Sequence, residues 1–252
     1  MFKISNIDMK KIFYIIGLTF GILSCDTNDD LIDYDKIELK SYIIDNYYND
    51  AKQLYFNEII QNRNHNNFNN PILDNREINK ILKIIQAVYD SDSTERDIVF
   101  DFYQIHGYYC YSFNSISLKV ETNKPEIENL SKGIIPTGKA KLDNLLTSYD
   151  FDSVRTSYSY PDFPWLTIYT KDEYNMIPIE REFEAIESVL IAEFSKGCVG
   201  DGNNISLTRS NSSATITFSI GSGDCPAGCI YHKYWEFKVS NGYAKFVRTY
   251  ED

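Results

Sequence analysis

Alternating apolar and polar residues predict β-strands in two parts of the chain. Over 115–122, Ile116, Leu118 and Val120 alternate with polar residues, which is the pattern of a half-buried strand. Comparable runs occupy 153–160, 165–170 and 188–194, and then 205–208, 215–220 and 235–239 nearer the C-terminus. The strands therefore fall into a central group and a C-terminal group.

Apolar residues at helical spacing predict three helices. Asp74 and Glu77 fit a capping box, in which the Asp74 side chain accepts a hydrogen bond from the Glu77 amide. The apolar positions that follow are three and four residues apart: Ile78, Ile81, Leu82 and Ile85. Further helical patterns begin at Pro136 and at Pro178, which suits a first helical position. Over 42–60 the helix and strand signals conflict, and no element is predicted there.

The C-terminal part is predicted to contain four antiparallel strands joined by tight turns. Asn241-Gly242 is the pair that a type I′ hairpin needs, because both of its central residues take positive φ. Residues 221–229 contain three glycines and one proline, and we expect them to form the turn between the second and third strands.

The N-terminus resembles a bacterial lipoprotein signal. Lys10 and Lys11 precede an apolar run over 12–23, which is too short for a comfortable membrane span, and Ser24-Cys25 follows. In the lipobox that this pattern resembles, the cysteine becomes the lipidated first residue of the mature chain, so Cys25 is the predicted lipidation site. The alternative is a cleaved signal with an incidental cysteine. Met9 is a second possible start beside Met1.

The charge of the chain narrows the possible partners. The formal net charge is −11, so phosphate backbones and anionic lipid headgroups repel the protein. We expect no nucleic-acid partner. Association with the outer membrane, on its periplasmic or surface face, would depend on the acyl chains of Cys25, such as palmitate.

The remaining cysteines predict disulfides. An even number in an exported chain favours pairing, and the residues involved are Cys110, Cys198, Cys225 and Cys229. Pro226 and Gly228 suit a type I turn that would bring Cys229 back beside Cys225. The alternative is a metal site of Cys225, Cys229 and His232, with Cys198 as the fourth ligand. An oxidising compartment favours the disulfide.

Other polar clusters carry weaker chemical signals. A set of oxygen-bearing side chains could bind calcium, but it lacks the EF-hand pattern and is interpreted as turn residues: Asp201, Asn203, Asn204 and Asp224. The histidines are His65, His106 and His232, and none lies in a catalytic signature. No catalytic residue, metal or cofactor is therefore predicted.

The order of elements over 115–195 is strand, helix, strand, strand, helix, strand. This resembles the ferredoxin-like propeptide and inhibitor domains of subtilisin-type proteases, including the closing Ile191-Ala192-Glu193. The expected fold is α+β, with a ferredoxin-like module followed by a small antiparallel β-module. The predicted divisions are 1–24 signal peptide, 25–40 tether, 41–95 helical segment, 96–197 ferredoxin-like module and 198–252 β-module.

The resemblance also implies one disulfide pairing. In a ferredoxin-like sheet the first and fourth strands are antiparallel neighbours. Cys110 precedes the first predicted strand and Cys198 follows the fourth, so the resemblance implies that these two cysteines meet. The other pair is then Cys225 with Cys229.

Three short segments carry a wider resemblance. ILKIIQAVY over 81–89, GDGNN over 200–204 and GDCPAGC over 223–229 resemble a set of uncharacterised Bacteroidota secreted proteins and lipoproteins. That family brings no known activity. We therefore expect a lipid-anchored, non-enzymatic binding protein with an unidentified protein partner, and a protease-inhibitor-like module is its sharper form. The alternative is a secreted hydrolase of unknown substrate that uses His232 or His106.

Overall fold

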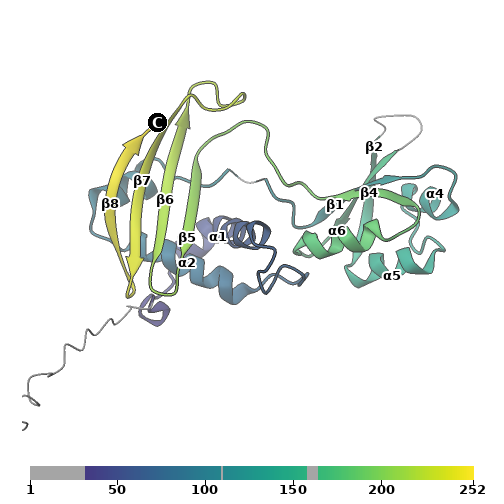
Figure 1. Cartoon of the computed structure of the whole chain (residues 1–252), viewed down its shortest axis with the longest axis horizontal. Coiled ribbons are helices and arrows are strands. Elements are labelled where there is room, and N and C mark those ends of the chain that lie inside the picture. The colour runs from purple at the N-terminus through teal and green to yellow at the C-terminus, as the bar shows by residue number, and fades with distance from the viewer. Residues whose placement is uncertain (1–31, 109, 158–163) are drawn as a thin grey trace, which may run out of the picture.

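A computed structural model describes residues 32–108, 110–157 and 164–252 (Figure 1). Within them the chain forms six α-helices and two four-stranded antiparallel sheets, which confirms the predicted α+β class. The two sheets lie toward opposite ends of the long axis of the molecule (Figure 1). Within the same residues, no helix combines the length and the apolar character that a membrane span requires. The predicted signal segment and Cys25 lie outside the described residues.

A short 3₁₀ turn, Tyr34–Lys36, precedes the first long helix, α1 (Ser41–Gln61). This helix occupies the stretch where the sequence signals conflict. Its buried residues Ile43, Tyr47, Ala51 and Tyr55 recur every four positions, so they form one apolar stripe along the helix.

Asp74 caps α2 (Asn75–Tyr89), as the sequence predicts. Its Oδ1 atom accepts from the Arg76 amide at 2.9 Å, so the expected bond to the Glu77 amide is wrong. The Arg76 guanidinium donates to the same Asp74 carboxylate at 3.2 and 3.1 Å, which holds it beside residue 76. The Glu77 carboxylate pairs with Lys80 at 2.6 Å and with Arg209 at 3.1 Å. The helix is followed by α3 (Thr94–Asp97) and a π-helical turn, Ile98–Phe102.

The first sheet has the strand order β2-β3-β1-β4, and every neighbouring pair is antiparallel. Its strands are β1 (Ser115–Val120), β2 (Phe151–Ser157), β3 (Trp165–Thr170) and β4 (Val189–Glu193). Ile116, Leu118 and Val120 are fully buried, as their alternation predicts. Residues 158–160, the end of one predicted strand, lie outside the described part of the chain.

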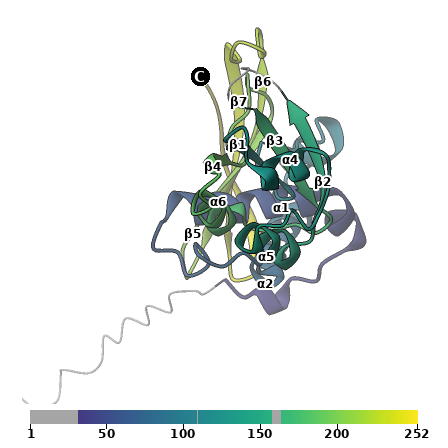
Figure 2. The same ribbon diagram turned by 90° about the vertical axis from the view of Figure 1, so that its right-hand side faces the viewer.

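Three helices accompany this sheet: α4 (Pro125–Ser131), α5 (Ala140–Ser148) and α6 (Met176–Glu184). Helix α6 contacts β1 and β4, whereas α4 and α5 contact β2; Figure 2 views the molecule from this end. Helix α4 was not among the predicted elements. The helix expected from Pro136 begins only at Ala140, because the amides of Thr137 and Gly138 donate to the Asp143 carboxylate and form a loop.

The second sheet is a meander in which each strand pairs with the next one along the chain. Its strands are β5 (Asn204–Arg209), β6 (Ala214–Ser222), β7 (Tyr231–Ser240) and β8 (Tyr243–Glu251). Asn241 and Gly242 have φ of 49° and 83°, so the predicted type I′ conformation of the last hairpin is confirmed.

The helical segment and the second sheet pack on each other, although the sequence suggested separate segments. Helix α2 contacts β6, β7 and β8, and α1 contacts β5 (Figure 1). The inward residues of the sheet, such as Phe218 and Phe237, are apolar and fully buried. They are buried because the helices cover that face of the sheet. The first sheet and its helices, from β1 to β4, are therefore inserted in the chain between the two parts of one packed unit. We call them the inserted unit.

Buried polar and aromatic contacts connect the two units. The Lys52 ammonium of α1 lies 2.6 Å from the Glu173 carboxylate, which follows β3. Asn175 caps α6 and donates to the carbonyl oxygens of Asn67 and Asn70 at 3.1 and 2.9 Å. The Phe56 ring of α1 makes edge contacts with Tyr111, Phe113 and Phe194.

Candidate functional site

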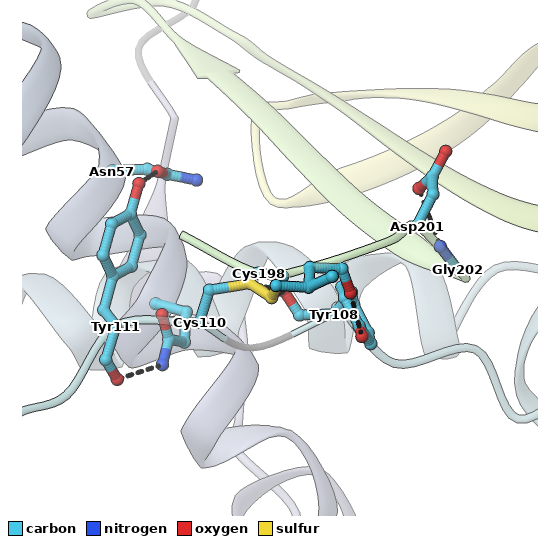
Figure 3. The surroundings of a disulfide bond; sticks show 9 residues. Asn57, Tyr108, Cys110, Tyr111, Cys198, Asp201 and Gly202 are labelled. Atoms are coloured by element: carbon cyan, nitrogen blue, oxygen red, sulfur yellow. Dashed lines mark hydrogen bonds between the residues drawn. A yellow bond between two sulfur atoms is a disulfide. The ribbon is translucent and has the colours of Figure 1, made fainter. Parts of the chain in front are cut away.

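Two chain segments run side by side between the two units. We call them the first crossing segment, which contains residues 110–112, and the second crossing segment, which contains residues 195–198. A disulfide joins them (Figure 3). The Ser112 amide donates to the Ser195 carbonyl at 3.1 Å, and the next residues on each segment form an antiparallel bridge. Beyond the bridge, Cys110 is bonded to Cys198, with their Cα atoms 5.0 Å apart. This separation is normal for a disulfide, so the geometry fits the pairing that the resemblance implied.

A pocket of about 170 Å³ opens beside this disulfide. It lies where α1, both crossing segments and the start of β5 meet. The lining mixes apolar and polar groups, and its polar side chains include Asp50, Gln53, Asn57, Tyr111, Lys196 and Asn204. We call it the junction pocket.

Hydrogen bonds between α1 and the first crossing segment fix one wall of the junction pocket. The Tyr111 hydroxyl donates to Asn57 Oδ1 at 2.6 Å (Figure 3). Gln53 donates to the Tyr111 carbonyl at 3.4 Å. Burial raises the pKa of Tyr111, so its hydroxyl remains a neutral donor over the physiological range. The wall is thus set before any ligand arrives.

Asp50 anchors the residues just before the first crossing segment to α1, beside this wall. Its side chain is 1% exposed. One carboxylate oxygen lies 2.8 Å from His106 Nδ1, and the other accepts from the Gly107 amide at 2.7 Å. The His106 ring also stacks on Tyr47, with centroids 4.6 Å apart. His106 is therefore held by contacts on both its edge and its face.

His232 of β7 lies between two carboxylates. Its Nε2 atom is 2.8 Å from Asp201 Oδ2, and its Nδ1 atom is 3.3 Å from Asp252 Oδ1. The side chains of His232, Asp201 and Asp252 are 19%, 40% and 64% exposed, so this cluster is on an open surface rather than in a deep pocket.

Hydrogen bonds and burial shift the pKa values of two groups around His232, Asp201 and Tyr234. The Gly202 amide, which donates to Asp201 at 2.7 Å, is the main cause that lowers the pKa of Asp201, and His232 acts in the same direction. Burial raises the pKa of Tyr234 to about 12, and the hydrogen bond that its hydroxyl donates to Asp252 adds to this effect. The lowered pKa keeps Asp201 a carboxylate acceptor at neutral pH.

The turn between β6 and β7 lies against the same cluster. It carries the second disulfide, Cys225–Cys229, with Cα atoms 3.9 Å apart. The Asp201 amide donates to the Cys225 carbonyl at 2.9 Å. A Cβ atom at Gly200 would lie 2.7 Å from that carbonyl, and one at Gly221 would collide with the Cys229 sulfur. Both glycines are therefore needed where the backbone packs on the turn.

The structure separates some residues that the sequence grouped. Cys198 is bonded to Cys110, away from Cys225 and Cys229, so it is not the fourth ligand of the alternative metal set. Among the calcium candidates, the side-chain oxygens of Asn203 and Asn204 accept from backbone amides, as expected for turn residues. His65 likewise accepts from the Asn67 amide within its loop.

Asp50 and Asp252, which the fold places beside histidines, were not among the candidate residues predicted from sequence. Asp50 lies on the buried side of α1, but no helix was predicted over 42–60, so its position gave no signal. Nothing in the spacing linked Asp252 to His232, because β-pairing of the last strand brings them together.

The chain matches no protein-family model, no curated protein and no solved structure.

Proposed function

We propose that the chain is a lipid-anchored protein of the bacterial cell envelope that binds a small polar ligand or a partner without catalysing a reaction. The signal pattern ending in Cys25 supports the anchor. Two cysteine pairs at bonding distance support an oxidising compartment outside the cytosol.

The observation that carries the proposal is the junction pocket. Ligand sites are most often concave and lie between structural units, with a few convergent polar groups. The junction pocket has these properties, and Cys110–Cys198 together with the Asp50–His106 contact fixes its walls. A preformed wall lowers the cost of ordering a binding site.

A hydrolase is the second candidate, because His232 gathers two carboxylates. Hydrolysis by a side-chain nucleophile needs a hydroxyl or thiol within hydrogen-bond reach of the histidine. In the described part of the chain, His232 and His106 bond to carboxylates and to no serine, threonine or free thiol. This arrangement favours binding. Turnover of a chromogenic ester or peptide that His232→Gln abolishes would instead favour the hydrolase.

The sharper form of the proposal treats the inserted unit as a ferredoxin-like, protease-inhibitor-like module. The strand order β2-β3-β1-β4 with antiparallel neighbours supports it. The same fold hosts many functions, so the direct test is inhibition of a subtilisin-type protease by the purified protein. If the protease cleaves the protein and is not slowed, the inhibitor hypothesis is wrong. The binding proposal is unaffected by that result.

Native mass spectrometry of protein purified from its source tests the junction pocket. Gly197 lines the pocket, and a Cβ atom there meets nothing within 4 Å, so Gly197→Leu fills space without disturbing a packed neighbour. We expect a bound small molecule on the wild type and on the control Asp92→Leu, which alters an exposed loop, but not on Gly197→Leu. Equal occupancy in all three proteins would place the ligand elsewhere.

Membrane fractionation tests the anchor separately. Cys25→Ala removes the acyl chains, and with a net charge of −11 the rest of the chain has no electrostatic attraction to anionic lipid. We expect the variant in the soluble fraction and the wild type in the membrane fraction. A variant that remains in the membrane fraction would contradict lipidation at Cys25.

A further inference from the structure

We propose that the turn closed by Cys225–Cys229 is a redox-controlled site for a thiolate-binding metal ion such as Zn²⁺. Its ligands would be Cys225, Cys229, His232 and Asp201. This site is separate from the junction pocket and does not depend on the proposed binding function.

The geometry of three of these groups carries the inference. One ligand atom each from Asp201, Cys229 and His232 lie within 4.8 Å of one another. Ligand atoms on a tetrahedral zinc ion at about 2.0–2.3 Å lie roughly 3.3–3.8 Å apart, so only small movements separate this arrangement from a bound one. Cys225 supplies the fourth group, because its sulfur is bonded to that of Cys229.

Asp201 is built into this turn by the backbone. Its amide donates to the Cys225 carbonyl, and its carboxylate accepts from the Gly202 amide. The carboxylate is thereby pointed at His232 Nε2, at 2.8 Å. The structure thus replaces Cys198, the fourth ligand considered from sequence, with an oxygen donor that is already in place.

His232 has the outer partner that metal-binding histidines use. A ligating imidazole normally donates its other ring N–H to a carboxylate, which fixes the tautomer and raises its basicity as a ligand. With Nε2 directed to Asp201, Nδ1 lies 3.3 Å from Asp252. Asp252 is itself held to His232 by two backbone hydrogen bonds of 3.2 Å. This second carboxylate would be an outer-shell partner and not a ligand.

The disulfide controls the site because a disulfide sulfur is not a thiolate. A dithiol reductant transfers two electrons and two protons to Cys225–Cys229, which yields two thiols while the reductant becomes a disulfide. Each thiol loses its proton to solvent as its sulfur binds the metal. Oxidation of both thiolates to the disulfide, with two electrons passing to an oxidant of the disulfide class, releases the ion.

Cobalt(II) binding to the purified protein tests the proposal, since sulfur-to-cobalt charge-transfer absorption reports thiolate ligation. We expect the phosphine-reduced protein to bind one ion with this band, and the oxidised protein to show none. Asp201→Asn and His232→Gln should weaken binding, and Asp252→Asn should weaken it about tenfold. Cys110→Ser/Cys198→Ser is the matched control, because reduction also opens that disulfide, and it should keep the band.

A second measurement needs no substitution. In the reduced wild type, Zn²⁺ should protect Cys225 and Cys229 from maleimide labelling and leave Cys110 and Cys198 reactive. Equal metal binding by oxidised and reduced protein would overturn the proposal. A band that persists in Cys225→Ser/Cys229→Ser, or zinc protection confined to the other two cysteines, would also overturn it.

Discussion

The two disulfides close loops of very different length, and this difference predicts their contributions to stability. Cys110 and Cys198 are 88 residues apart in sequence, whereas Cys225 and Cys229 are 4 apart. The perturbation is to replace each pair separately by serine in the oxidised protein. The longer loop contains the whole inserted unit, so its cross-link restricts far more of the unfolded chain.

The chain-entropy relation gives the magnitude. For loops of these lengths it predicts stabilisation of about 4.6 kcal/mol by Cys110–Cys198 and about 1.9 kcal/mol by Cys225–Cys229 at 25 °C. Loss of the longer cross-link should therefore lower the free energy of unfolding by about 2.7 kcal/mol more than loss of the shorter one.

The two tryptophans make urea unfolding a local assay. Trp165 lies in β3 of the inserted unit, and Trp235 lies in β7 of the other sheet. In a Trp235→Phe background the remaining Trp165 reports the inserted unit alone. In a Trp165→Phe background the remaining Trp235 reports the other unit alone. We expect Cys110→Ser/Cys198→Ser to shift the transition seen through Trp165 more than Cys225→Ser/Cys229→Ser does. Equal shifts, or the reverse order, would refute the loop-length reasoning.

Three further perturbations have defined outcomes. Asp74→Ala removes the side chain that caps α2, which should cost about 1 kcal/mol in urea unfolding; an unchanged midpoint would show that the cap is dispensable. Arg209→Met should cost about 2 kcal/mol because it leaves the Glu58 carboxylate unpaired, and adding Glu58→Gln should restore part of the loss; no recovery would contradict coupling of the pair. Burial, reinforced by the hydrogen bond to Glu182, raises the pKa of Tyr149 to about 12, above its unfolded value of about 10. This stabilisation is complete below pH 10 and is lost as the pH rises toward 12, so Tyr149→Phe should flatten the alkaline loss of stability, and an identical profile would contradict the assignment.

The regular alternation of the second sheet made it predictable from sequence. Trp235, Phe237 and Val239 point to the covered face, as their spacing predicts, and they are 0–2% exposed. The Asn241-Gly242 turn was also predictable because positive φ at both positions is a local requirement.

Helix α1 was not predictable because partners distant in sequence stabilise it. Asp50 and Lys52 are polar yet buried, which breaks the apolar pattern on which a helix prediction depends. The Lys52 ammonium is offset by Glu173, 121 residues away in the chain. The short helix α4 was missed for a different reason, since it buries only Ile127 and Leu130.

The candidate sites could be predicted only in part. Cys225 and Cys229 were paired from the local turn, and the other pair followed from a resemblance in strand order. The groups around His232 arise from strand pairing and from the packing of residues 200–202 on a turn. Contacts of that kind leave no spacing in the sequence, so Asp201 could be proposed only as a turn residue.

The insertion of one unit into another imposes an order on biosynthesis. Helices α1 and α2 leave the ribosome before the strands that cover their apolar faces, and the whole inserted unit is made in between. The inserted unit has its own sheet and can collapse early, whereas the helices must wait for β5 through β8. During that interval the apolar faces of α1 and α2 are exposed, which favours aggregation until β5 through β8 are available to cover them.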